Sequence, residues 1–378
     1  MSEALIVGVA ETPYLRRPDP GVTTHGLLAE AARAALAAAG LEPSEIDGLG
    51  VSSFSLAPDR AIDLAVRLGV RLSWLMDAGT GGASALDLLQ HARRAVEAGD
   101  ARAVLLVAGD RLDPPAFARL VDDYNRWTRE LLAPLPTGGP NALFALVTQR
   151  HMQAHGLERR DYGMVAVAQR GWAAGNPNAA YREPLTLSEY LDAPVVADPL
   201  TIYDCVPVVA GADAVVVAAE VRSSGPGVRV RALRLRHNHD SQEGDGLSTG
   251  LGEARDALWT EAALGPEDAD VVSVYDDYPV MTLVQLNELG FVDGDLRRFV
   301  ADRLATRALP VNTSGGQLSS GQAGAAGGLH GLVEVVKQLR GEAGDRQVAD
   351  ARIGVVSGYG MVAYRYGASA GAAVLERA

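Results

Sequence analysis

The chain has 378 residues, more than one compact core usually holds, so we expect two domains or one duplicated domain. Its formal net charge of −13 argues against nucleic acid and against an anionic membrane as partners. The longest apolar runs, such as Ala103–Gly109, are too short to span a bilayer, and the first residues lack the basic segment of an export signal. We therefore expect a cytoplasmic protein without a membrane segment.

In chain order, hydrophobic periodicity and end signals predict alternating strands and helices. The expected elements are a strand at 4–9, a helix from a Thr24 cap to Gly40, a strand at 48–54, a helix at 85–98 and a strand at 103–109. A similar series follows later, with a helix at 247–263, a strand at 271–275, a helix at 329–341 and strands at 353–358 and 364–375.

The two series share local landmarks, which indicates a duplication. Pro43 and Asp47 precede the strand at 48–54 just as Pro266 and Asp270 precede the strand at 271–275. Two βαβ-rich halves favour parallel-centred sheets with helices on both faces. We place the halves at residues 1–225 and 226–378. The segment at about 114–203, rich in Pro, Trp, Tyr and Asn, is interpreted as a helical cap over the first half.

Residue types that are rare in this chain limit which nucleophiles, disulfides and metal sites are possible. Cys205 is the only cysteine, so an intramolecular disulfide and a cysteine-based metal cluster are excluded, and we interpret it as a structural thiol. Lys337 is the only lysine, and the apolar residues around it share one helical face, so we expect it to point to water rather than form a Schiff base. His237 and His239 have strand spacing but no third ligand nearby, so we predict no metal site.

Three glycine-rich joints next to strands and helices are the most informative places. The first, Gly79–Gly82, precedes a helix whose unpaired N–H groups suit an oxyanion. The second runs from Asn312 through Gly315 and Gly316 to Gln322, also before a helix, and the third is Ser357–Gly360, after a strand. These joints are the candidate functional sites.

At these joints the chain resembles the thiolase superfamily, in particular its sterol-carrier/lipid-transfer type, and the likeness covers nearly the whole chain. Asn312, Gly315 and Gly316 are similar to the family's Asn-x-x-Gly-Gly signature, and Gly321-Gln322 to its Gly-His-Pro signature. The landmarks of the cap are Met152–Gly156, Asn176–Ala179, Pro184–Thr186, Ala197–Leu200 and Asp204-Cys205. The resemblance implies an α/β, five-layered α-β-α-β-α sandwich of two duplicated halves with a helical cap insertion. It also implies a homodimer, a coenzyme A thioester as substrate and no covalently bound cofactor.

The catalytic residues of a thiolase do not carry over. Its nucleophilic cysteine falls at Gly79 or Thr80, its activating histidine at Gln322 and its second cysteine near Val356 or Ser357. An acyl-cysteine cannot form at these positions, and Thr80 has no histidine beside it in the motifs. The resemblance therefore does not imply ordinary thiolysis here.

A related branch of lipid-transfer thiolase-like proteins lacks the cysteines and acts as aldolases, which cleave 3-hydroxyacyl-CoA side chains of steroids with tyrosines. This chain is similar in having Tyr359 within Ser-Gly-Tyr-Gly. It departs in the longer Gly321–Gly324 loop, which has no tyrosine, so Tyr275, in Tyr275-Asp276-Asp277-Tyr278, is the candidate for the second role. A phenol can act as a base or an acid if neighbouring dipoles lower its pKa.

The leading hypothesis is a cysteine-independent C–C lyase that cleaves a 3-hydroxyacyl-CoA by a retro-aldol reaction. Tyr359 or Tyr275 would take the β-hydroxyl proton, while helix-start N–H groups with Gln322 and Asn312 would hold the thioester enolate. The candidate positions for binding the coenzyme A thioester are Gly79, Gly81, Gly82, Gly315 and Gly316. A non-catalytic acyl-CoA-binding or scaffold subunit and a Claisen-type acyltransferase using Thr80 or an alternative thiol stay open as alternatives. The resemblance also implies a small zinc-ribbon/OB-fold protein as partner.

Overall fold

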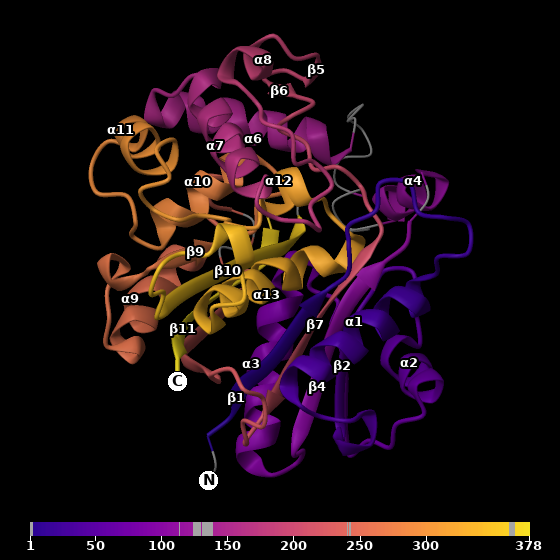
Figure 1. Cartoon of the computed structure of the whole chain (residues 1–378). Coiled ribbons are helices and arrows are strands. Elements are labelled where there is room, and N and C mark those ends of the chain that lie inside the picture. Colours follow the sequence, from indigo (N-terminus) through magenta and orange to yellow (C-terminus); the bar gives the residue numbers. More distant parts are fainter. Residues whose placement is uncertain are drawn as a thin grey trace.

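The computed structural model describes residues 3–112, 114–123, 130, 139–239, 241, 243–362 and 367–378. Its strands form a nine-stranded mixed sheet in the order β3-β2-β4-β7-β1-β8-β11-β10-β9, and helices flank it (Figure 1). No helix in the described ranges combines the length and apolar character needed to cross a membrane.

The first half of the sheet contains five strands. They are β1 (Leu5–Glu11), β2 (Gly48–Ser52), β3 (Trp74–Asp77), β4 (Ala103–Asp110) and β7 (Gly211–Ala218). β2 pairs in parallel with β3 and β4, whereas β7 runs antiparallel between β4 and β1. Every residue of β4 and β7 is buried, as expected for strands covered on both faces.

The second half repeats this arrangement. Its strands are β8 (Val228–His237), β9 (Val271–Ser273), β10 (Ile353–Val362) and β11 (Gly367–Arg377), and Val311 adds a parallel bridge to Val272 of β9. The two halves join where β1 meets β8 over only two residue pairs, Leu5 with Arg229 and Ile6 with Val228. The matching strand orders support the predicted duplication, while the boundary at 225/226 stays a prediction.

The helices and the two half-sheets make five layers, which confirms the predicted sandwich. α1 (Thr24–Ala39) and α2 (Arg60–Leu68) pack on the outer face of the first half-sheet. α3 (Ser84–Ala98) and α13 (Gly327–Arg340) share one apolar core with the inner faces of both half-sheets. α9 (Leu251–Ala262) and α10 (Pro279–Glu288) join the core on the outer face of the second half-sheet.

Most of the helical cap lies on the second half, not on the first as the sequence suggested, whereas its first helix, Pro114–Asp123, lies beside the first half (Figure 1). Its elements are α4 (Pro114–Asp123), α6 (Pro140–His155), α7 (Arg159–Ala173), α8 (Leu187–Leu191), β5 (Val195–Ala197) and β6 (Leu200–Thr201). Phe144 of α6 and Val165 of α7 share a core with Met281 and Val284 of α10. Figure 1 shows α6 and α7 above α10. The expectation failed because the cap follows the first half in sequence, whereas its apolar helix faces pack on α10.

Two short helices complete the second half, α11 (Leu296–Phe299) and α12 (Gly316–Ser320).

The residues that start and stop helices predicted the ends of the longer helices to within a few residues. α1 begins after Thr23, whose side chain accepts a hydrogen bond from the Gly26 amide, so the cap is one residue earlier than predicted. It ends at Gly40, which has the left-handed conformation expected of a C-terminal stop.

Candidate functional site

Tyr275 lies in the short segment between β9 and α10, and its backbone is held from both sides by one amide. The Tyr275 N–H donates to Gln285 Oε1 (3.3 Å), and Gln285 Nε2 donates to the Tyr275 carbonyl (2.7 Å). The Ser357 hydroxyl also donates to Gln285 Oε1 (2.9 Å), which ties the segment to β10. The backbone of Tyr275 is therefore fixed by neutral groups.

The Tyr275 hydroxyl meets Gln322, the residue that stands at the position of the thiolase histidine. Gln322 Nε2 donates to the Tyr275 hydroxyl at 2.7 Å, and both side chains are half-buried. Gln322 is itself anchored, because its N–H donates to the Pro207 carbonyl (2.8 Å) and its carbonyl accepts from the Val209 N–H (3.2 Å). The structure thus brings together two candidates that are 47 residues apart in the sequence.

The first glycine-rich joint packs directly against this pair. A short 3₁₀ turn, Gly81–Ala83, leads into α3. A Cβ on Gly82 would lie 2.4 Å from the Tyr275 ring and 2.2 Å from the Tyr359 carbonyl oxygen, so only glycine fits here. These contacts bring together Gly81, Gly82, Tyr275 and Gln322. We call this group, with Gln317 as its fifth member, the tyrosine joint.

Tyr359 touches the tyrosine joint with its ring edge, but its hydroxyl lies elsewhere. The rings of Tyr275 and Tyr359 are edge to face, with centroids 5.3 Å apart. Tyr359 is fully buried, and its hydroxyl donates to Asp277. Burial, and then the Asp277 carboxylate, raise the pKa of Tyr359 well above its ordinary value. Of the two candidate tyrosines, the geometry favours Tyr275 as the proton acceptor.

Two carboxyl groups that follow Tyr275 are buried and face different partners. Asp276 accepts hydrogen bonds from the backbone N–H groups of Gln317 (2.9 Å) and Leu318 (3.3 Å), at the start of α12. Burial raises the pKa of Asp276 to about 8 and that of Asp277 to about 7, although Tyr359 donates to Asp277 and opposes the shift. Asp276 thus occupies the helix start that Gly315 and Gly316 form, where we had expected the coenzyme A thioester.

The side chains of Asn312 and Thr80 form hydrogen bonds with neighbouring groups of the protein. Asn312 Oδ1 accepts from the Ser273 hydroxyl (3.1 Å) and the Val274 N–H (2.9 Å), so this buried side chain supports the end of β9. The Thr80 hydroxyl donates to the Asp87 carboxylate of α3, while Gly79 beside it is exposed. The roles predicted for both residues stay predictions.

Cys205 has the environment of a structural thiol. It is half-buried and packs against the core of the second half. Burial, followed by the charges of Asp204 and Asp277, raises its pKa to about 12. A thiol with that pKa stays protonated at neutral pH, so Cys205 is a poor nucleophile.

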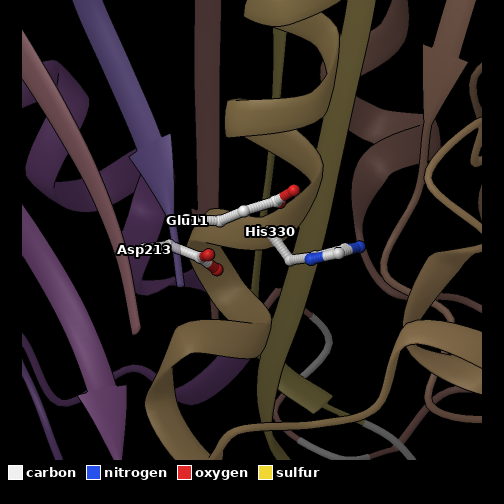
Figure 2. Close-up of side chains that lie close together, drawn as sticks. All are labelled: Glu11, Asp213 and His330. Atoms are coloured by element: carbon white, nitrogen blue, oxygen red, sulfur yellow. The ribbon is translucent and has the colours of Figure 1, made fainter. Parts of the chain in front are cut away.

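No local sequence pattern pointed to a group of buried titratable side chains behind the Gln322 loop. We call this group the charged cluster: Glu11, Tyr14, Asp213, His330 and Lys337. Glu11 and Asp213 come from neighbouring strands, and His330 comes from α13 (Figure 2). The Tyr14 hydroxyl lies 2.7 Å from Asp213 Oδ1 and 2.6 Å from His330 Nδ1. These side chains link β1 and β7 to the central helix layer.

Lys337 belongs to this cluster, so the expectation that it points to water is wrong. Its ammonium lies 2.9 Å from Glu11 Oε1, and its side chain is only 16% exposed. The helical-face argument failed because α13 lies in the central layer and is covered on more than one side. Burial raises the pKa of Glu11, but Lys337 and then His330 lower it more, to about 2.

Glu11, Asp213 and His330 place ligand atoms within 4.8 Å of one another, a spacing that a metal ion could use. The Lys337 ammonium, however, already supplies a positive charge at Glu11, and Asn178 Nδ2 donates to the same Glu11 oxygen (3.0 Å). The donor set therefore fits an internal ion pair better than a divalent cation.

Comparison with known proteins agrees with the fold. Residues 232–377 match the family model "Thiolase C-terminal domain-like". The chain is 32% identical to the 17-hydroxy-3-oxo-4-pregnene-20-carboxyl-CoA lyase of Mycobacterium tuberculosis, over 90% of this chain and 92% of the relative. It is 30% identical to the steroid side-chain-cleaving aldolase of Thermomonospora curvata, over 89% and 90% of the two chains.

Among solved structures, the chain is similar to an "Ltp2-ChsH2(DUF35) aldolase", with a TM-score of 0.84, 27% identity and coverage of 99% of this chain and 98% of the other. Identity above 30% over nine-tenths of a relative, the matching family model and this shared fold confirm the resemblance stated from the joints. The chain therefore belongs to the thiolase superfamily, in its lipid-transfer-type, aldolase-like branch.

Proposed function

We propose that the protein is a cysteine-independent C–C lyase that cleaves a 3-hydroxyacyl-CoA by a retro-aldol reaction, with Tyr275 as the base. The observation that carries the proposal is the hydrogen bond from Gln322 to the Tyr275 hydroxyl, at the place where the start of α3, β10 and the Gln322 loop meet. A donor aimed at a phenol oxygen stabilises the phenolate more than the phenol. A phenolate is a competent general base.

The proposed reaction is balanced without an outside reagent. The Tyr275 phenolate takes the proton from the β-hydroxyl, and the electron pair of that O–H bond becomes part of the new ketone carbonyl. The Cα–Cβ bond breaks, and its electrons pass into the thioester as an enolate. N–H groups of the Gly79–Gly82 segment stabilise the enolate oxygen. Cα then takes the proton that Tyr275 removed from the hydroxyl, which gives an acyl-CoA and restores the phenolate.

The relatives support this substrate class. The name of the Mycobacterium tuberculosis lyase describes a CoA thioester whose carboxyl carbon is attached to C20 and whose hydroxyl is on C17. That hydroxyl is on the β-carbon, which is the arrangement a retro-aldol cleavage requires. We propose a coenzyme A thioester with a β-hydroxyl as substrate for this chain, and no covalently bound cofactor.

We also propose two assembly partners. The name of the similar solved structure joins two components, which supports the small zinc-ribbon/OB-fold partner that the family resemblance implied. A homodimer is supported by the edge strand β3, whose Leu75 is 45% exposed next to the exposed Ile62 and Val66 of α2. An open strand edge with apolar neighbours is a ready surface for a second copy.

The proposal is tested with a panel of 3-hydroxyacyl-CoA thioesters that differ in the substituents on the β-carbon, incubated with the protein alone and with the protein encoded beside it. We expect release of a ketone and an acyl-CoA in equal amounts. Tight binding of the thioesters without turnover in every combination would instead support a binding or scaffold subunit. Light scattering of the protein alone measures whether it is a dimer.

A further inference from the structure

Gln317, in the first turn of α12, carries a buried oxygen that has no partner. The residue is 1% exposed, and its side-chain Oε1 makes no hydrogen bond to any described residue. Its backbone N–H donates to Asp276 Oδ1 at 2.9 Å, so the position of the residue is fixed. A buried carbonyl oxygen without a donor loses its hydrogen bond to water and gains none in return, so such an atom calls for an explanation.

The oxygen and the Tyr275 hydroxyl both lie next to Gly327, the first residue of α13. A Cβ on Gly327 would lie 2.2 Å from Gln317 Oε1 and 3.3 Å from the Tyr275 hydroxyl oxygen. Glycine at position 327 therefore lets Gln317 Oε1 lie close to the start of α13, on the side where the Tyr275 hydroxyl also lies. Gln322 already donates to the same hydroxyl at 2.7 Å. Tyr275 thus has one amide that donates to it and lies near a second amide whose oxygen has no partner among the described residues.

We propose that Gln317 is a positioning residue for Tyr275, whose side-chain oxygen accepts the hydrogen bond from the phenol once Tyr275 carries a proton. Gln322 then favours the charged form of Tyr275, and Gln317 favours the neutral form. The balance between them contributes to the pH at which Tyr275 changes charge. This deepens the proposed lyase function, but the exchange between the two glutamines is a property of the site that can be measured without turnover.

The test is the titration of Tyr275, followed by NMR of tyrosine labelled with ¹³C at Cζ, with Tyr275→Phe to assign the signal. In Gln317→Glu, the carboxylate accepts from the phenol and repels the phenolate, so the midpoint moves up by about one pH unit or more. In Gln317→Met the acceptor is removed at similar volume, so the midpoint moves down. Opposite shifts are a signature that a merely structural side chain would not produce.

Gln169→Met is the matched control. Gln169 of α7 is 2% exposed, and both polar atoms of its side chain lack a partner among the described residues, so it is an equally buried glutamine in the cap. We expect no shift of the Tyr275 midpoint in this variant. If Gln317→Glu does not fold, the Gln317→Met variant alone tests the proposal. An upward shift of the Tyr275 midpoint in Gln317→Met would mean that the Gln317 amide donates to Tyr275 rather than accepts from it.

An unchanged midpoint, or shifts of the same sign in both Gln317 variants, would overturn the inference. Failure of the lyase proposal looks different, because the unsubstituted protein would then cleave no 3-hydroxyacyl-CoA while the two titration shifts persisted. If both proposals hold, Gln317→Met also changes the pH dependence of kcat and leaves KM within about threefold, because Gln317 acts through Tyr275 rather than on substrate binding.

Discussion

The tyrosine joint and the charged cluster are neighbouring polar regions with opposite designs. In the charged cluster, Glu11 pairs with Lys337, and Tyr14 bridges Asp213 and His330. In the tyrosine joint, the neutral amide of Gln322 donates to the Tyr275 hydroxyl. Each region has one buried oxygen without a hydrogen-bond partner among the described residues, Asp213 Oδ2 in the charged cluster and Gln317 Oε1 in the tyrosine joint. The two regions therefore differ in the charge of the groups that they bury.

The difference suggests that the charged cluster stabilises the fold and that the tyrosine joint carries out the reaction. Buried charges that satisfy one another hold two layers of the fold in register, and removing one of them leaves the other without compensation. Neutral amides cost less free energy to bury than charged groups, and their hydrogen bonds to a half-buried phenol still shift its pKa. We therefore expect changes in the charged cluster to alter the free energy of unfolding and changes in the tyrosine joint to alter turnover.

The largest effect is expected from Tyr275→Phe, which removes the proposed base and keeps the ring that packs on Gly82. We expect kcat/KM for 3-hydroxyacyl-CoA cleavage to fall by about 10² to 10⁴, with little change in thermal stability. Steady-state kinetics and thermal melting measure the two quantities. The comparison variant is Tyr359→Phe, for which we expect less than a tenfold loss of turnover and a lower melting temperature, because Asp277 loses its donor. A larger loss of turnover in Tyr359→Phe would reverse the assignment.

Glu11→Gln tests the charged cluster. The Glu11 side chain is fully buried and that of Lys337 nearly so, so the variant leaves the ammonium without its counter-charge. We expect the free energy of unfolding in urea to fall by about 3–5 kcal/mol, while kcat of the folded protein stays within about threefold. Asp302→Asn, which breaks the exposed pair with Arg298, is the control and should cost at most about 1 kcal/mol. A small loss in Glu11→Gln would mean that the cluster does not carry stability.

Removal of the Gln322 donor gives a smaller effect. In Gln322→Leu the phenolate loses a hydrogen bond worth about 1.4 kcal/mol, so kcat should fall about tenfold. The acid limb of the pH–rate profile should also move to higher pH, because the charged form of Tyr275 is no longer favoured. A tenfold loss without a shift of that limb would mean that Gln322 acts on the substrate and not on Tyr275.

A further prediction concerns the pH dependence of stability. The pKa of Glu11 is lowered from an ordinary value of 4.5 to about 2, so its contribution to stability is present above pH 4.5 and is lost as pH falls toward 2. The stability difference between the unsubstituted protein and Glu11→Gln should therefore shrink over that range in urea titrations. Asp276 and Asp277 have raised pKa values and shift stability in the opposite direction, but they are the same in both proteins and cancel in the difference. A difference that stayed constant would contradict the depressed pKa of Glu11.

The layered fold could be predicted from the sequence because its signals are local and repeated. The Pro43/Asp47 and Pro266/Asp270 landmarks each precede a buried strand, and Gly40 and Gly341 end helices in the left-handed conformation. The glycine-rich joints also identified the place where Tyr275 and Gln322 meet. The position of the cap could not be predicted, since it depends on which half offers a complementary apolar face.

The rest of the site depends on contacts between distant residues. Asp213 and His330 are 117 residues apart, and nothing local to either one indicates that Tyr14 lies between them. Gln317 and Gln285 are common polar residues whose importance comes only from what they face. The pair Asp276-Asp277 did offer a signal, because two adjacent acids directly after a buried strand are unusual enough to suggest a specific environment.

The most direct test of the account is a single-turnover reaction of the Cys205→Ser variant with a cleaved 3-hydroxyacyl-CoA, followed by product analysis and by the intact mass of the protein. Because the account assigns proton transfer to Tyr275 and gives no role to a thiol, it predicts ketone and acyl-CoA at the rate of the unsubstituted protein, with no mass added to the chain at any time. Loss of cleavage in Cys205→Ser, or an acyl group attached to either protein during turnover, would contradict it.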